Sequence, residues 1–222
     1  MIRNPLAIAI AALALAAGPA YAQKDIDKVN GSITADAGQT YGDLDTVNGS
    51  IRIEAGARVA DAGTVNGSIK VAENATVESL STVNGSIRAE DGLKADGDVS
   101  TVNGSIFVGR GGSIGGDIET VNGAIGLVDT DLAGGIETVN GDLTVGAGSH
   151  VRAGIRYTKP NRNWLGFGKQ RDPRVIIGPD ARVDGPLVFE REVKLYVHST
   201  AQIGPVTGAT AQRYEGDRAP RD

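Results

Sequence analysis

Val29-Asn30-Gly31-Ser32-Ile33 is the first of seven copies of one short phrase in this chain. The leading valines of successive copies are 18, 18, 18, 19, 19 and 18 residues apart. The later copies begin at Val47, Val65, Val83, Val102, Val121 and Val139, and the last one ends in Leu143. A fixed short period indicates one structural unit stacked many times, so this repeat decides the fold.

Apolar residues recur in each repeat at offsets of about 0, 4, 6, 12 and 15 from the leading valine, as in Val65, Ile69, Val71, Val77 and Leu80. This spacing lacks the 3.6-residue period of an amphipathic helix and predicts three short strands per repeat with inward side chains. Asn-Gly marks one corner, because both residues tolerate a positive φ. We therefore predict an all-β fold, a three-sided parallel β-solenoid with about 18 residues per coil. A right-handed coil is favoured because parallel crossover connections are overwhelmingly right-handed.

The N-terminus has the features of an export signal. Arg3 precedes the apolar run 6–17, and Ala20-Tyr21-Ala22 is a small-x-small cleavage site. We expect a signal peptide over 1–22, cleaved after Ala22, and a periplasmic or secreted mature protein. No transmembrane span is expected in the mature chain, because no later segment holds roughly 18 consecutive apolar residues.

The mature chain divides into three parts. We expect the β-solenoid over 23–206, an insertion loop at 157–174 where the period breaks, and a disordered tail over 207–222. Charge is uneven: residues 23–156 hold 10 Lys/Arg and 19 Asp/Glu, whereas residues 157–222 hold 11 and 8. An acidic body and a basic end favour head-to-tail contact between copies. The overall charge of −5, together with export, argues against a nucleic-acid partner.

The stacked coils, and above all Ile177-Gly178-Pro179-Asp180-Ala181-Arg182-Val183-Asp184-Gly185-Pro186-Leu187, resemble the bactofilin family of polymer-forming bacterial proteins. The resemblance covers about 23–206. It implies a right-handed three-sided β-helix that assembles end to end into filaments without nucleotide. Bactofilins are typically cytoplasmic, so this chain resembles an exported variant. The repeats are also similar to those of exported adhesins.

Several polar residues recur with the repeat. The asparagines are expected to stack at one corner as a structural turn ladder, in preference to a ligand site; they are Asn30, Asn48, Asn66, Asn84, Asn103, Asn122 and Asn140. Aspartates four residues before a leading valine form an acidic column of Asp43, Asp61, Asp98 and Asp117. Stacked carboxylates suit a hard cation such as Ca²⁺, although solvated turn aspartates, and hence no metal, are the favoured interpretation.

The threonines that precede the valines are expected to face outward, where a flat threonine face suits ordered water or a crystalline surface; they are Thr46, Thr64, Thr82, Thr101, Thr120 and Thr138. Ordinary β propensity on a solvent face is the favoured explanation of this column.

The insertion holds the one nonrepetitive cluster, formed by Trp164 and Phe167 among Arg162, Lys169 and Arg171. Aromatic and cationic side chains together stack on sugars, anionic polymers or a protein surface. The alternative is that the two aromatic rings cover the flank of the solenoid. These five residues are therefore a candidate binding site.

No catalytic residue stands out. His150 and His198 are the two histidines, neither has an evident carboxylate partner, and two are too few for a three-histidine zinc site. We expect no enzyme and no cofactor. Two functions stay open. One is an exported scaffolding rod, which self-assembles end to end because neither end shows a strong cap. The other is an adhesin-like module that uses 157–174 to bind polysaccharide, cell wall or another envelope protein.

Overall fold

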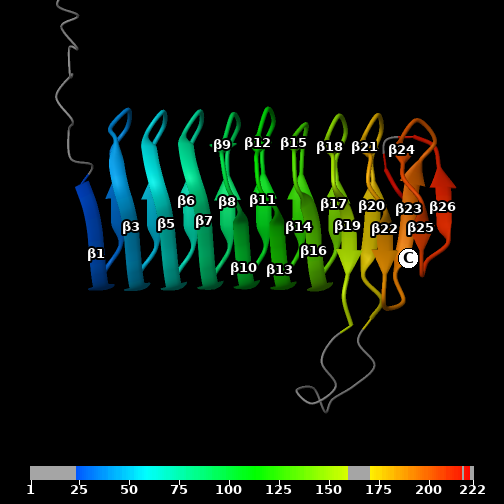
Figure 1. The fold of residues 1–222 in the computed structure, drawn as a ribbon, viewed down its shortest axis with the longest axis horizontal. Coiled ribbons are helices and arrows are strands. Elements are labelled where there is room, and N and C mark those ends of the chain that lie inside the picture. The colour runs from blue at the N-terminus through cyan, green and yellow to red at the C-terminus, as the bar shows by residue number, and fades with distance from the viewer. Residues whose placement is uncertain (1–23, 160–170, 217, 221–222) are drawn as a thin grey trace, which may run out of the picture.

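The computed structural model describes residues 24–159, 171–216 and 218–220. All secondary-structure elements in this part of the chain are β-strands. Their coils stack along one axis and form a rod (Figure 1). Paired strands are parallel, and equivalent residues of successive repeats lie opposite one another, as Asn48 and Asn66 do. The all-β parallel solenoid of about 18 residues per coil is therefore confirmed. The predicted signal peptide lies outside the described residues.

One sheet takes one strand from each of ten coils. Its strands are β2 (Ile33–Ala35), β4 (Ile51–Ile53), β6 (Ile69–Val71), β8 (Ile87–Ala89), β11 (Ile106–Val108), β14 (Ile125–Leu127), β17 (Leu143–Val145), β20 (Arg174–Ile177), β23 (Lys194–His198) and β26 (Ala211–Tyr214).

The second sheet has 16 strands in two columns that meet at β7. The longer column contains β1 (Lys24–Asn30), β3 (Tyr41–Asn48), β5 (Arg58–Asn66), β7 (Thr76–Asn84), β10 (Val99–Asn103), β13 (Ile118–Asn122), β16 (Gly135–Asn140), β19 (Gly154–Tyr157), β22 (Leu187–Phe189) and β25 (Val206–Thr207). The shorter column contains β9 (Lys94–Ala95), β12 (Ser113–Ile114), β15 (Asp131–Leu132), β18 (His150–Val151), β21 (Arg182–Val183) and β24 (Gln202–Ile203).

The coil changes shape along the rod. In the N-terminal coils one long strand, such as β5 or β7, spans two sides. The first half of β7 then pairs with β9 and its second half with β10. The 19-residue step from Val83 to Val102 places an extra residue at 96–98, between the inward Ala95 and Val99, and so divides the strand. Three separate strands per coil are therefore found from β9 onward.

The valine and threonine columns have the opposite orientation from the one we predicted. Apolar residues at offsets 4, 6, 12 and 15 are buried, but the leading valines lie outward: five of the seven are exposed, with Val65 at 40%, and Val121 and Val139 are half-buried. The preceding threonines are 2–5% exposed. Along β5 and β7, Ala62 and Leu80 point inward, so the residue two positions later must also point inward, and that residue is threonine. The outward threonine face is therefore wrong, and no threonine surface exists at this column.

Hydrogen bonding explains why threonine is inside. Thr64 Oγ1 donates to the Gly49 carbonyl of the preceding coil at 2.9 Å, and Thr82 does the same to Gly67. Valine has the same shape but cannot satisfy a carbonyl oxygen at this corner.

The Asn-Gly corners also differ from expectation. None of the repeat asparagines has a positive φ, although the glycines Gly31, Gly123 and Gly141 do, at 111°, 159° and 153°. Gly85 is required instead by close approach, because a Cβ atom there would lie 1.8 Å from the Gly67 carbonyl oxygen. Left-handed backbone occurs at another corner, where Gly56 has a φ of 67° and Asn74 a φ of 57°.

The predicted tail is partly structured. Strand β26 pairs with β23 from Leu195–Ala211 to His198–Tyr214, so the solenoid extends beyond residue 206. Tyr214 is 7% exposed, and its ring meets that of His198 edge-on at a centroid distance of 5.1 Å. This aromatic contact holds the last strand on the stack, so a disordered tail from residue 207 is wrong for the segment 207–214.

Candidate functional site

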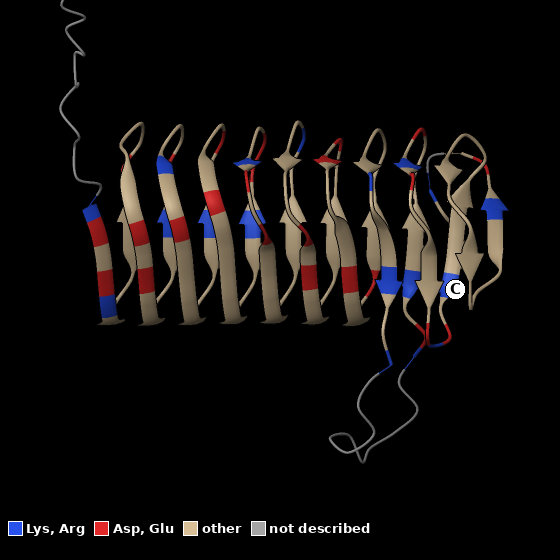
Figure 2. Cartoon of the chain, viewed as in Figure 1, with Lys and Arg blue, Asp and Glu red and all other residues tan. Residues whose placement is uncertain are grey.

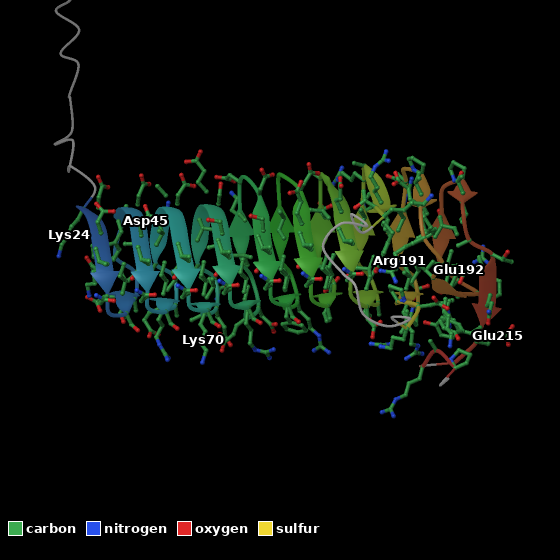
Figure 3. The ribbon with its side chains drawn as sticks, turned by 90° about the horizontal axis from the view of Figure 1, so that it is seen from below. Lys24, Asp45, Lys70, Arg191, Glu192 and Glu215 are labelled. Atoms are coloured by element: carbon green, nitrogen blue, oxygen red, sulfur yellow. The ribbon has the colours of Figure 1, made fainter. Side chains whose placement is uncertain are left out.

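The seven repeat asparagines lie in one hydrogen-bonded ladder along a corner of the rod. From Asn48 onward, each Nδ2 donates to Oδ1 of the asparagine in the preceding coil, at 2.9–3.1 Å. All the side-chain amides point the same way, so Asn140 Oδ1, at the end of the ladder, accepts no hydrogen bond from another repeat asparagine. Arg191 Nη1 donates to Asn140 Oδ1 and, at 3.0 Å, to the Val139 carbonyl. Arg191, labelled in Figure 3, therefore places a cation at the oxygen end of the ladder.

The four aspartates of the acidic column lie on the outer surface as two separate pairs, with Ser79 beside Asp61 in the register. Asp43 Oδ1 accepts the Asp61 N–H at 3.3 Å, and Asp98 Oδ1 accepts the Asp117 N–H at 2.8 Å. These carboxylates thus bind backbone amides of the next coil. Among the described residues, no group of three or more His, Asp or Glu side chains is placed to hold a metal ion.

A second acidic column lies two residues closer to the valines. Burial is the main cause that raises the pKa of Asp45, and repulsion from Asp27, Asp43 and Asp61 raises it further. Burial and the adjacent Glu137 raise the pKa of Glu119 in the same way. Bands of acidic residues on the strands from β1 to β16 give this side of the rod a negative potential (Figure 2).

The described base of the insertion is anchored to the solenoid. Arg171 Nη2 pairs with Asp142 Oδ2 at 2.7 Å, and the Arg174 N–H donates to Asp142 Oδ1 at 2.9 Å. Asp142, Arg171, Pro173 and Arg191 line a shallow cavity of about 250 Å³ at the end of the asparagine ladder. The remaining predicted binding residues, Arg162, Trp164, Phe167 and Lys169, lie outside the described residues.

The structure brings together a charged cluster that the sequence did not reveal. His150 Nε2 lies 2.8 Å from Asp184 Oδ2, and its Nδ1 lies 3.8 Å from Asp131 Oδ1. A bidentate contact from Arg152 lowers the pKa of Asp131, and a hydrogen bond from Arg182 lowers that of Asp184. Asp131, His150 and Arg182 occupy one register position in successive coils. The repeat period could have placed Asp131 beside His150, 19 residues later, but the insertion hides the position of Arg182. The cluster lies on the surface, with the His150 side chain 28% exposed. Its ion pairs bridge neighbouring coils.

His198 has a different environment. It is 8% exposed, and its Nδ1 accepts the Thr200 N–H at 3.2 Å. His198 is therefore a buried histidine that packs against Tyr214 at the end of the rod.

Both ends of the stack carry a cation at an inward register position, contrary to the expected lack of caps. Lys28 stands opposite Thr46 in the buried column, and its Nζ donates to the Ser32 carbonyl at 2.8 Å. At the other end Arg213 stands opposite the buried Val197, and it donates to the His198 and Ala201 carbonyls at 3.1 and 3.2 Å. These cations satisfy carbonyls of the terminal coils and put charge at edge strands.

The same two ends leave apolar side chains only half-buried. Ile26 packs on the core from β1, while Ile203, Val206 and Ala211 do so from the last coil. Lys24 and Glu215, labelled in Figure 3, mark these opposite ends.

Comparison of the chain with protein-family models, with curated proteins and with solved structures finds no match. Within the described residues, the structure contains no helix long and apolar enough to span a bilayer.

Proposed function

We propose that this protein is an exported scaffold, a rigid rod that assembles end to end with copies of itself in the periplasm or envelope. One observation carries the proposal: the core is incomplete at both ends in matching columns. Ile26 lies in the inward column of Leu44, and Val206 lies in the same column beyond Leu187. Because both are half-buried, contact between the two ends of different copies removes apolar surface from water.

The strand edges fit the same arrangement. Strands β1 and β2 begin the two sheets, and β25 and β26 end the corresponding columns. If the stack continues from one copy into the next, β25 meets β1 and β26 meets β2. Val206 then lies on Ile26, and the unpaired backbone groups of the edge strands gain partners.

The inward cations set the strength of this contact. The column of Arg213 continues through Ile53 to Ala35 at the other end of the rod. In an end-to-end contact Arg213 therefore lies one residue from Asp36 of the next copy. A junction with so much charge should be modest in affinity and weaken as salt is added.

The shared architecture also supports the resemblance to bactofilins, whose β-helices polymerise end to end. A parallel β-solenoid, which this chain forms with ten coils, is the kind of architecture that the resemblance implies. Filament formation by this chain remains a proposal, as does its export.

Sedimentation velocity of the mature chain tests the scaffold. Ile26→Asp puts a charge on the junction, and it should reduce the large species to single rods while leaving the circular dichroism spectrum unchanged. Ser113→Asp is the matched control, because Ser113 is exposed on β12 in the middle of the rod, away from both ends. A single species for the unmodified chain, at every concentration and at low salt, would refute end-to-end assembly.

A second candidate function is an adhesin-like module, favoured by the anchored base of the insertion at Asp142. Fixed loop ends reduce the entropy lost when a loop binds a ligand. Cosedimentation with isolated peptidoglycan tests this candidate. Trp164→Ala with Phe167→Ala should abolish retention in a binding module while end-to-end assembly persists. Equal retention of both proteins excludes these two rings as the binding site.

A further inference from the structure

The leading valines form a continuous apolar ridge on the outside of the rod. Their exposed fractions are 68% for Val29, 41% for Val47, 40% for Val65, 39% for Val83 and 37% for Val102. Val121 and Val139 continue the ridge in a half-buried state. A single exposed valine is ordinary, but seven in register, one coil apart, make a contiguous apolar strip.

A groove lies directly beside this valine ridge. The residue two positions before each valine also points outward, and in the middle of the rod it is small: Gly63, Ser81 or Ser100. A hollow of about 540 Å³ follows the ridge from Val29 to Val83 and is also lined by Gly63 and Ser81. The N-terminal part of this face therefore carries a ridge and a groove side by side.

We propose that this face pairs two copies of the chain side by side and antiparallel, with the valine ridge of each copy against the valine ridge of the other. A twofold axis in the contact plane, perpendicular to both rods, sets each column of one copy against the same column of the other, as a symmetric dimer requires. The pairing goes beyond the proposed end-to-end assembly and does not depend on it.

The charges along the groove select this occupant and this direction. The groove column is acidic at Asp27 and Asp45, neutral in the middle and acidic again at Glu119 and Glu137. It is basic at Arg156, whose Nη1 also lies 3.3 Å from Glu190 Oε1. In a parallel pair each carboxylate would face either its own copy or the partner's valines, and like-charge repulsion or loss of water disfavours both.

An antiparallel pair centred on Ser100 avoids every such clash. Asp45 then faces Arg156 of the partner, because each lies three coils from the centre. By the same counting Glu137 faces Gly63 and Glu119 faces Ser81 of the partner. The charge pattern is therefore complementary to itself in one orientation.

The contact area predicts a weak dimer. Seven valines span six coil spacings, or about 29 Å, and the strip is about two residues wide. Such a strip is smaller than a standard interface of roughly 1,200–2,000 Å². We expect measurable pairing at high protein concentration, and stronger pairing where rods are joined end to end and many strips act together.

Cysteine crosslinking tests the pairing, since the chain has no native cysteine. Ser100→Cys places a thiol at the proposed axis, and mild oxidation should give a covalent dimer. Ser113→Cys is the control, because Ser113 is exposed on the neighbouring column. Equal crosslinking of the two variants, or none for Ser100→Cys, would overturn the proposal.

A charge test on the ridge checks the same proposal without crosslinking. Val65→Lys with Val83→Lys should weaken dimerisation in sedimentation equilibrium at least tenfold, whereas Thr76→Lys with Ser113→Lys should not. Ser100→Cys should still crosslink when Ile26→Asp has removed end-to-end contact, so failure of one mode is distinguishable from failure of the other. Unchanged dimerisation of the valine variant contradicts the ridge as the interface.

Discussion

Replacing Thr82 by valine removes one hydroxyl from the interior of the rod and conserves its shape. Thr82 is 4% exposed, and its Oγ1 donates to the Gly67 carbonyl at 2.9 Å. A net hydrogen bond of this kind contributes roughly 0.5–1.5 kcal/mol. Gly67 is half-buried, so water can replace part of the lost contact. We therefore expect Thr82→Val to lower the free energy of unfolding by about 1 kcal/mol.

Thr138 provides the matched control in the same column. Its Oγ1 is buried and has no hydrogen-bond partner among the described residues. A buried, unpartnered hydroxyl is unfavourable, so Thr138→Val should be neutral or stabilising by up to about 1 kcal/mol. The two variants make the same chemical change and are predicted to differ in stability because one hydroxyl is bonded and the other is not.

Urea unfolding followed by far-ultraviolet circular dichroism measures both variants. With an m-value of roughly 1–3 kcal/mol/M, a loss of about 1 kcal/mol lowers the midpoint by ~0.3–1 M. The m-value must stay unchanged, because stacked repeats can unfold in parts. Equal midpoints for Thr82→Val and Thr138→Val would refute the inward, hydrogen-bonded threonine column.

Two further predictions concern the corners and the acidic face. Gly85→Ala should lower the melting temperature strongly, because the new Cβ would lie 1.8 Å from a backbone oxygen and disrupt the surrounding coils. Gly56→Ala should cost only about 1–2 kcal/mol, because Gly56 has a left-handed backbone but open space around it. Similar melting temperatures for the two variants would contradict this distinction. The melting temperature should rise as pH falls from about 6 to about 4, since the raised pKa values of Asp45 and Glu119 make the folded state bind protons more tightly than the unfolded chain. This contribution is fully present below the ordinary pKa values, 3.8 for Asp and 4.5 for Glu, and is lost as pH rises through the folded pKa values. Asp45→Asn with Glu119→Gln should therefore flatten the profile, and an unchanged profile would count against these two carboxylates.

The repeat period made the fold predictable, but not the orientation of every residue in it. Offsets 4, 6, 12 and 15 could be assigned because isoleucine, valine and leucine there are buried. The leading valine misled because threonine and valine are isosteric, and hydropathy favours valine inside. Strand alternation carried the correct signal: an inward Leu80 requires an inward Thr82 and an outward Val83.

Features that join distant coils were harder to predict. His150 and Asp184 are 34 residues apart, and the insertion between them breaks the period used for counting. The register of β18 and β21, which places them in neighbouring coils, is known only from the structure. The end cations were missed for another reason: Lys28 looks like an ordinary surface residue until its position opposite Thr46 is known.

Electron microscopy of the purified mature chain tests the central claim most directly. Ten coils at a strand spacing of roughly 4.8 Å make a single rod about 45 Å long. End-to-end assembly predicts rods several times that length at low salt, which Ile26→Asp shortens to single rods. A uniform population of single rods about 45 Å long at high concentration and low salt would contradict it.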